Sequence, residues 1–92
     1  MSVTDQAYFD LIIVSPDATV FEGPVIKLIA PGYNQDIAIL PNHTPLYAQL
    51  NQGELLITAP DGYQKNIPID GGIIRVKLNR ASIIVGFDIL RH

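Results

Sequence analysis

Few side chains of this sequence could do chemistry, and their spacing does not match a catalytic or metal-binding arrangement. A serine or cysteine nucleophile needs a base beside it, yet cysteine is absent and the only histidines are His43 and His92. None of the three serines, Ser2, Ser15 and Ser82, lies in a strand-to-helix elbow. A metal site needs several ligands at close spacing, and neither histidine has such companions. We therefore expect no catalytic residue, no metal, no cofactor and no enzyme activity in this chain by itself.

The pair Gly71-Gly72 is the nearest approach to a phosphate-binding loop. It is followed by Ile73-Ile74-Arg75 rather than by Lys and Ser or Thr, and no helix follows it. The carboxylates fall mostly at expected turns or strand ends, where we interpret them as solvated or turn-capping groups. These nine residues are Asp5, Asp10, Asp17, Glu22, Asp36, Glu54, Asp61, Asp70 and Asp88.

The segment Pro41-Asn42-His43-Thr44-Pro45 predicts a stiff bend. Each proline fixes its own φ near −65° and pushes the residue before it toward extended geometry. Such a bend suits a rigid corner for a partner to contact, and it also suits a packed turn. His43 could pack on a proline and hydrogen-bond the backbone, or it could be an exposed contact, and the residue types leave both interpretations open.

Composition bounds the remaining possibilities. The net charge is −3, and the six basic residues are scattered along the chain, which argues against nucleic-acid binding. No apolar run approaches the length needed to span a bilayer. The absence of cysteine and of a secretory leader fits a reducing, cytosolic compartment. Only 16% of the residues are charged, which leaves neutral or apolar surface and favours a protein partner.

The elements that must position these side chains are short β-strands. β-branched runs recur about every ten residues, bounded by Pro, Gly, Asn or Asp, and no segment has helical periodicity. The runs are residues 9–14, 19–21, 25–30, 37–40, 46–50, 54–58, 63–69, 72–78 and 82–85. Asp61-Gly62 between two runs is a strong hairpin signal. The pattern predicts an all-β sandwich or barrel of nine or ten short strands.

The chain is expected to form one domain. We expect a flexible N-terminus over residues 1–8, a β-sandwich domain over 9–88 and a C-terminal stub over 89–92. The runs 11–14 and 83–85 are apolar on both faces, although a sandwich buries only one face of each strand. Either loops cover these outer faces or a partner does.

Four segments, in this order and spacing, resemble the N-terminal β-sandwich domain of the epsilon subunit of F-type ATP synthases, the counterpart of the mitochondrial delta subunit. They are Ile13-Val14-Ser15-Pro16, Val20-Phe21-Glu22-Gly23, the corner Ile39–Leu46, and Gly71-Gly72-Ile73. The resemblance covers nearly all of residues 9–88. It implies an all-β sandwich of ten strands in two five-stranded sheets.

The resemblance also implies a function without catalysis. Epsilon belongs to the central stalk of the rotor, where it joins gamma to the membrane c-ring and couples proton or sodium flow to ATP synthesis. The implied location is peripheral, at the cytoplasmic face of a bacterial plasma membrane or its organellar equivalent. The implied gamma-facing residues are Ser15, His43 and Ala48. The implied c-ring-facing loop is Pro31, Gly32, Tyr33, Asn34, Gln35 and Asp36.

The chain departs from the family pattern in two places. Where members usually have Gly-Glu-x-Gly, this chain has Gln35-Asp36-Ile37-Ala38, so both glycines are replaced. Members commonly continue into a C-terminal helical hairpin that can inhibit ATP hydrolysis and that binds ATP in some of them. No such hairpin follows His92, so nucleotide binding is not expected here.

The alternative hypothesis is a free-standing β-sandwich module that binds a carbohydrate or a peptide. Such a module usually presents exposed aromatic residues on a flat face. Tyrosines are the candidates for this face, since tryptophan is absent, and their spacing forms no obvious platform. They are Tyr8, Tyr33, Tyr47 and Tyr63.

Overall fold

The computed structural model describes residues 7–86, and all regular structure within that range is β-strand. The strands are β1 (Phe9–Val14), β2 (Thr19–Val25), β3 (Lys27–Pro31), β4 (Asp36–Ile39), β5 (Leu46–Thr58), β6 (Gln64–Lys77) and β7 (Arg80–Val85). No helix in the described part of the chain is long and apolar enough to cross a membrane. The flexible N-terminus expected over residues 1–8 lies outside the described residues except for Ala7 and Tyr8, and the stub at 89–92 lies wholly outside them.

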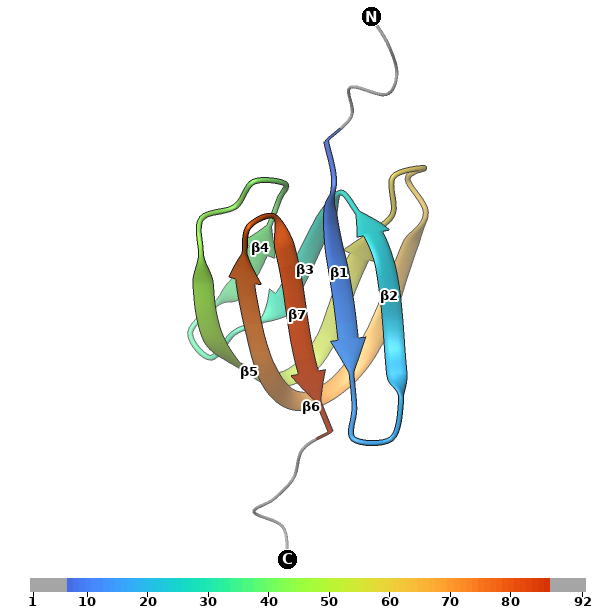
Figure 1. Ribbon diagram of the computed structural model, residues 1–92. Coiled ribbons are helices and arrows are strands. Elements are labelled where there is room, and N and C mark those ends of the chain that lie inside the picture. Colours follow the sequence, from blue (N-terminus) through green and yellow to red (C-terminus); the bar gives the residue numbers. More distant parts are fainter. Residues whose placement is uncertain (1–6, 87–92) are drawn as a thin grey trace, which may run out of the picture.

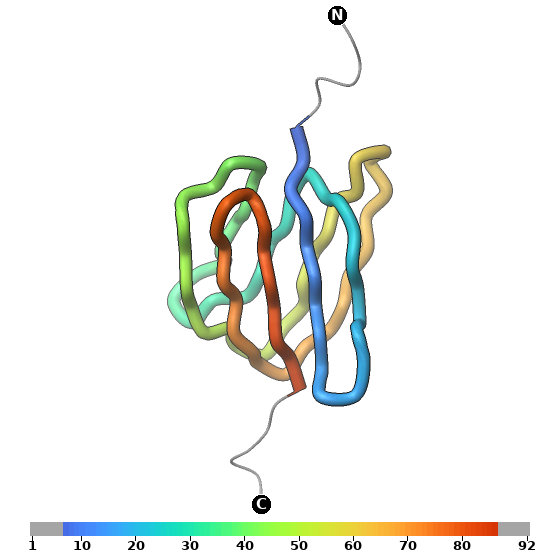
Figure 2. The backbone as a smooth tube through the Cα atoms, viewed as in Figure 1, coloured from blue at the N-terminus to red at the C-terminus, as the bar shows by residue number. Residues whose placement is uncertain are grey.

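Hydrogen bonds join the strands into one seven-stranded sheet in the order β2-β1-β7-β6-β5-β3-β4. The β1–β7 pair is parallel, and the other neighbours are antiparallel. The two central strands, β5 and β6, are 13 and 14 residues long. Both curve sharply near the bottom of the view in Figure 1, so the sheet folds over onto itself as two layers. The backbone trace of Figure 2 shows the same fold-over.

The expected all-β sandwich is confirmed, whereas ten strands in two five-stranded sheets are not. Nine apolar runs become seven strands because two pairs of runs merge across their turn-like residues. The segment around Gly53 stays within β5, and the segment around Gly71 stays within β6, with Leu50 paired to Gly72 and Gln52 paired to Asp70. These turn residues bend long strands and do not end them.

Glycine is required at this bend in β6. Gly71 has φ +92°, a left-handed conformation that L side chains rarely adopt. A Cβ on Gly72 would lie 2.4 Å from the carbonyl oxygen of Ile84, because β7 passes directly beside it. The Gly71-Gly72 pair therefore allows the sheet to fold.

The core lies between the two layers and follows the period-two pattern of the strands. On β1, Phe9, Leu11 and Ile13 are fully buried, whereas Asp10 points outward. The core cluster draws on strands of both layers, and the structure buries no polar or charged side chain in it within residues 7–86. Its members are Phe9, Leu11, Ile13, Val25, Leu28, Ala30, Ile39, Leu50, Leu55, Ile57, Ile69, Ile74, Val76, Ala81, Ile83 and Val85.

The hairpin predicted at Asp61-Gly62 is confirmed as the β5–β6 connection. The Gly62 N–H donates to the carbonyl of Ala59 at 2.8 Å, and Gly62 has φ +91°. The Tyr63 N–H donates to Asp61 Oδ1 at 2.9 Å. The aspartate therefore caps its own turn, as expected of a carboxylate at this position.

Candidate functional site: a braced corner and a side cavity

The corner between β4 and β5 is a tight turn. The His43 N–H donates to the carbonyl of Leu40 at 3.1 Å, which closes a four-residue turn over Pro41 and Asn42. Asn42 takes φ +64°, a conformation that asparagine tolerates better than most residues. Pro41 and Asn42 are thus the residue types that this backbone needs. The expected stiff bend is present.

The β6–β7 hairpin, which comes much later in the sequence, holds this corner in place through hydrogen bonds of Asn79. The Asn42 N–H donates to Oδ1 of Asn79 at 2.7 Å, and Nδ2 of Asn79 donates to the carbonyl of Tyr8 at 2.8 Å. The carbonyl of Asn79 also accepts from the Asp10 N–H at 3.2 Å. Asn79 therefore joins three segments: the corner, the β6–β7 hairpin and the start of β1. Figure 1 shows all three at the upper end of the sandwich.

His43 is half-buried, and its ring is held by the backbone. Its Nδ1 lies 2.7 Å from the carbonyl oxygen of Thr44. A carbonyl oxygen can only accept, so Nδ1 must be the donor in this hydrogen bond. This is the backbone-bonded arrangement of the first interpretation, on a side chain that still has exposed surface.

Ser15 lies at the opposite end of the sandwich. Its Oγ donates to the carbonyl of Ala18 at 3.2 Å and accepts from the Ala18 N–H at 3.3 Å, which caps the β1–β2 turn. Gly86, at the end of β7, is its neighbour, because a Cβ placed there would lie 3.8 Å from the Ser15 Cβ. β1 runs from the corner's end to this turn (Figure 1). The structure does not bring Ser15 and His43 into one patch.

Ala48 lies on the side of the sandwich, beside the loop expected to face the c-ring. The alanine is half-buried and packs against the core. It shares a shallow cavity of about 380 Å³ with loop residues, among them Tyr33 and Gln35. Pro31 ends β3 and Asp36 begins β4, so the loop itself is residues 32–35. The expected gamma-facing surface at Ala48 and the expected c-ring-facing loop are therefore contiguous in the structure.

The replaced glycines leave the local backbone unstrained. Within residues 7–86, only Asn42, Leu78 and Asn79 combine a side chain with positive φ, so neither Gln35 nor Ala38 does. Gly32 is the glycine that this loop requires. A Cβ on Gly32 would lie 2.5 Å from the Gln35 carbonyl oxygen, and Gly32 forms an isolated bridge with Leu50.

The four tyrosines are exposed but do not share a surface. Tyr8 precedes β1, Tyr33 is in the β3–β4 loop, Tyr47 is on β5, and Tyr63 follows the turn at Gly62. The β3–β4 loop and the β5–β6 hairpin lie at opposite ends of the sandwich (Figure 1), so Tyr33 and Tyr63 do not belong to one flat aromatic platform. The outer face of β7 is open at its apolar end, where Ile84 is 42% exposed.

Sequence reasoning placed Asn79 in a turn but did not identify it as a residue of the site. The available signal was its position in a two-residue hairpin turn, where Asn is favoured because both residues need positive φ. Leu78 and Asn79 occupy that turn with φ +51° and +60°, between the paired residues Lys77 and Arg80. The contact of Asn79 with the corner is a tertiary contact that no local pattern predicts.

Comparison with known proteins gives one family. The model of the family described as ATP synthase, Delta/Epsilon chain, beta-sandwich domain matches residues 8–87. The ATP synthase epsilon chain of Dichelobacter nodosus is 37% identical over 76 residues, covering 83% of this chain and 53% of that protein. The Leptospira borgpetersenii epsilon chain is 39% identical, covering 87% and 62%. The Chlorobium limicola epsilon chain is 34% identical, covering 91% and 94%.

The chain thus spans little more than half the length of the first two relatives and nearly the full length of the third. Two solved structures share its fold. A chain of the Euglena gracilis mitochondrial ATP synthase (OSCP/F1/c-ring) superposes with a TM-score of 0.82 at 21% identity, covering 86% of this chain and 51% of that one. A chain of the Tetrahymena thermophila mitochondrial ATP synthase (central stalk/c-ring) gives 0.72 at 18%, covering 85% and 63%.

Proposed function

The chain belongs to the ATP synthase delta/epsilon family through its β-sandwich domain, and from this premise we propose that it is a non-catalytic central-stalk subunit. It joins gamma to the c-ring and couples proton or sodium flow to ATP synthesis. It associates peripherally with the membrane through the complex, on the cytoplasmic face or its organellar equivalent. The match of residues 8–87 to the family carries this proposal. Inhibition and ATP binding through a helical hairpin are not part of it.

The mechanism we propose is rigidity. A coupling subunit transmits torque only if it deforms little, and here the corner is tied to two other segments through Asn79. A preformed surface also loses little conformational entropy on binding. The braced corner therefore supports a docking role for His43.

The positions of the implied interface residues constrain the direction in which gamma can run across the sandwich. Ser15 and His43 are at opposite ends of β1, whose six residues span roughly 20 Å. A partner that contacts both must therefore run along the strands rather than sit at one end. Ala48 extends the surface to the side cavity, where it lies beside residues 32–35 of the proposed ring-facing loop.

Site-specific crosslinking tests this placement. The chain has no cysteine, so each introduced cysteine is unique. We expect Ser15→Cys and His43→Cys to crosslink to gamma, and Tyr33→Cys to the c-ring, in the assembled enzyme. Tyr63→Cys, at the exposed β5–β6 hairpin, is the control and should form neither adduct. Failure of the unmodified chain to bind gamma would contradict the function, whereas crosslinking from Tyr63→Cys alone would contradict only the placement.

No observation favours the carbohydrate- or peptide-binding alternative, because the exposed tyrosines are separated. Saturable binding to a glycan array would revive it.

A further inference from the structure

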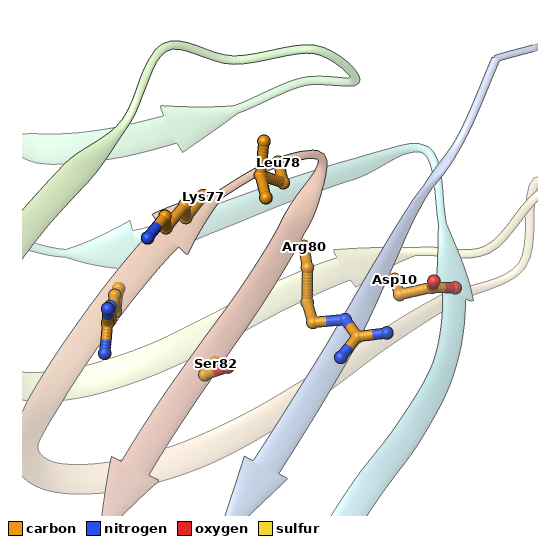
Figure 3. A pocket seen from close by; sticks show the side chains of 6 residues that line it. Asp10, Lys77, Leu78, Arg80 and Ser82 are labelled. Carbon is orange, nitrogen blue, oxygen red and sulfur yellow. The ribbon is translucent and has the colours of Figure 1, made fainter.

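Three cations gather on the outer face of the β6–β7 hairpin. A surface cavity of about 520 Å³ there is lined by Asp10, Arg75, Lys77, Leu78, Arg80 and Ser82. Figure 3 shows Lys77 and Ser82 on the two strands of the hairpin, Leu78 at their turn, and the Arg80 side chain extended across β1 toward Asp10. We call Arg75, Lys77 and Arg80 the cation cluster. It holds three of the five Lys and Arg side chains of residues 7–86, in a chain of net charge −3. The expectation that the basic residues are scattered is therefore wrong in three dimensions.

Strand register produces this cluster. Arg75 and Lys77 are two residues apart on β6, and Arg80 and Ser82 are two residues apart on β7. Because residues two apart on a strand point to the same face, all four side chains share one face of the hairpin. Lys77 pairs directly with Arg80, and Arg75 pairs with Ser82. Like charges placed directly opposite each other destabilise a sheet. The hairpin thus carries a repulsion that a bound anion would relieve.

The donors present suit a phosphate group. Arginine guanidinium groups match phosphate oxygens with paired hydrogen bonds, lysine adds a compact charge, and the Ser82 hydroxyl can donate as well. The lining has no aromatic side chain, and its one apolar member, Leu78, is 86% exposed. The cavity therefore presents positive charge and hydrogen-bond donors to anionic oxygens. It has no aromatic side chain on which a nucleobase could stack. We propose that the cation cluster binds the phosphate or pyrophosphate group of a soluble anion.

The choice of a soluble anion over a lipid headgroup rests on the proposed function. The β6–β7 hairpin is hydrogen-bonded to the corner at Asn42. The corner follows β4, and the proposed ring-facing loop precedes β4, so the two lie at opposite ends of that strand. With the loop directed toward the membrane sector, the cation cluster faces away from it.

Acidic side chains on the neighbouring strands oppose binding. Asp10 on β1 pairs in register with Arg80, and a second cavity of about 310 Å³ is lined by Asp10, Glu22 and Arg80 among others. Asp10 competes with any anion for Arg80. Removing its charge should therefore tighten binding.

The test is a titration of the 92-residue chain with sodium phosphate and with pyrophosphate at low ionic strength, followed by amide chemical shifts in NMR spectra. We expect dissociation constants on the order of 1 mM, the weak end of the affinity scale, with shifts confined to β6, β7 and the start of β1. Arg75→Gln should weaken binding about tenfold, and Asp10→Asn should tighten it. Lys27→Gln removes an exposed cation from outside the cavity and should leave affinity unchanged.

The variant Arg80→Gln distinguishes a loss of phosphate binding from a loss of folding stability. It should weaken phosphate binding while leaving the free energy of unfolding nearly unchanged, because the lost repulsion with Lys77 offsets the lost attraction to Asp10. Equal loss of affinity in Lys27→Gln and Arg75→Gln, or no shifts with either anion, overturns the proposal. Binding to anionic vesicles without binding to soluble phosphate overturns the choice of ligand. Because the isolated chain is used, none of these results bears on gamma binding.

Discussion

The backbone N–H of Asn42 donates a hydrogen bond of 2.7 Å to the side chain of Asn79, 37 residues further along the chain. Both asparagines have positive φ, and each occupies a turn that needs it. Two tight turns at the same end of the sandwich are thereby joined through one amide group. That group also reaches the carbonyl of Tyr8, so the corner that carries His43 is held from two directions.

Replacing Asn79 should loosen this end of the molecule. Asn79→Gly keeps the positive φ but removes both side-chain hydrogen bonds, so we expect the free energy of unfolding to fall by about 1–2 kcal/mol. Denaturant titration measures this loss, and hydrogen exchange at the Asn42 amide should report faster opening. An unchanged exchange rate at Asn42 would show that the hydrogen bond does not hold the corner.

Leu78 is expected to be a destabilising residue in its own turn. It has φ +51°, and its side chain is 86% exposed, so it carries backbone strain without much burial. Leu78→Gly should raise the free energy of unfolding by about 1 kcal/mol through relief of left-handed strain. The same denaturant titration checks this, and a loss of stability would mean that the exposed leucine makes contacts that outweigh the strain.

Two glycine substitutions should differ sharply. Gly62→Ala introduces strain at φ +91° but meets no atom within 4 Å, so it should cost about 1–2 kcal/mol. Gly72→Ala places Cβ against the Ile84 carbonyl oxygen and should cost more than about 3 kcal/mol or prevent folding, because backbone atoms must move. Thermal unfolding of the two variants measures the difference. Equal losses would mean that β7 can shift away from β6.

The side cavity is expected to be part of the gamma interface. Ala48→Glu places a charge on the half-buried wall that Ala48 shares with Tyr33, and it should weaken gamma binding at least tenfold. Gln64→Glu introduces the same charge at an exposed position of β6 and is the control. Circular dichroism must first show that Ala48→Glu folds. His43→Ala, which loses only a side chain of the corner, covers the case in which it does not.

Affinity for gamma, measured by surface plasmon resonance, decides between these outcomes. Weaker binding in His43→Ala and Ala48→Glu, with Gln64→Glu unchanged, fits the proposed surface. If neither variant differs from the unmodified chain, gamma binds elsewhere on the sandwich.

The sequence by itself determined the strand class and the main hairpin. Alternating apolar residues such as Phe9, Leu11 and Ile13 require a strand with one buried face, and Asp61-Gly62 requires a tight turn. These features depend on neighbouring residues only, so local patterns are sufficient to predict them. The family segments extended that prediction to the sandwich.

Tertiary structure alone decided what happens between distant residues. Gly71 could have ended a strand or bent one, and the pairing of Leu50 with Gly72 made it a bend. Strand register, which single segments do not specify, placed Asp10 opposite Arg80 and Asn79 beside Asn42. It also separated Ser15 from His43 by the length of β1. Pairing free energy is summed over whole strands, so the neighbours of each side chain are settled only when the sheet closes.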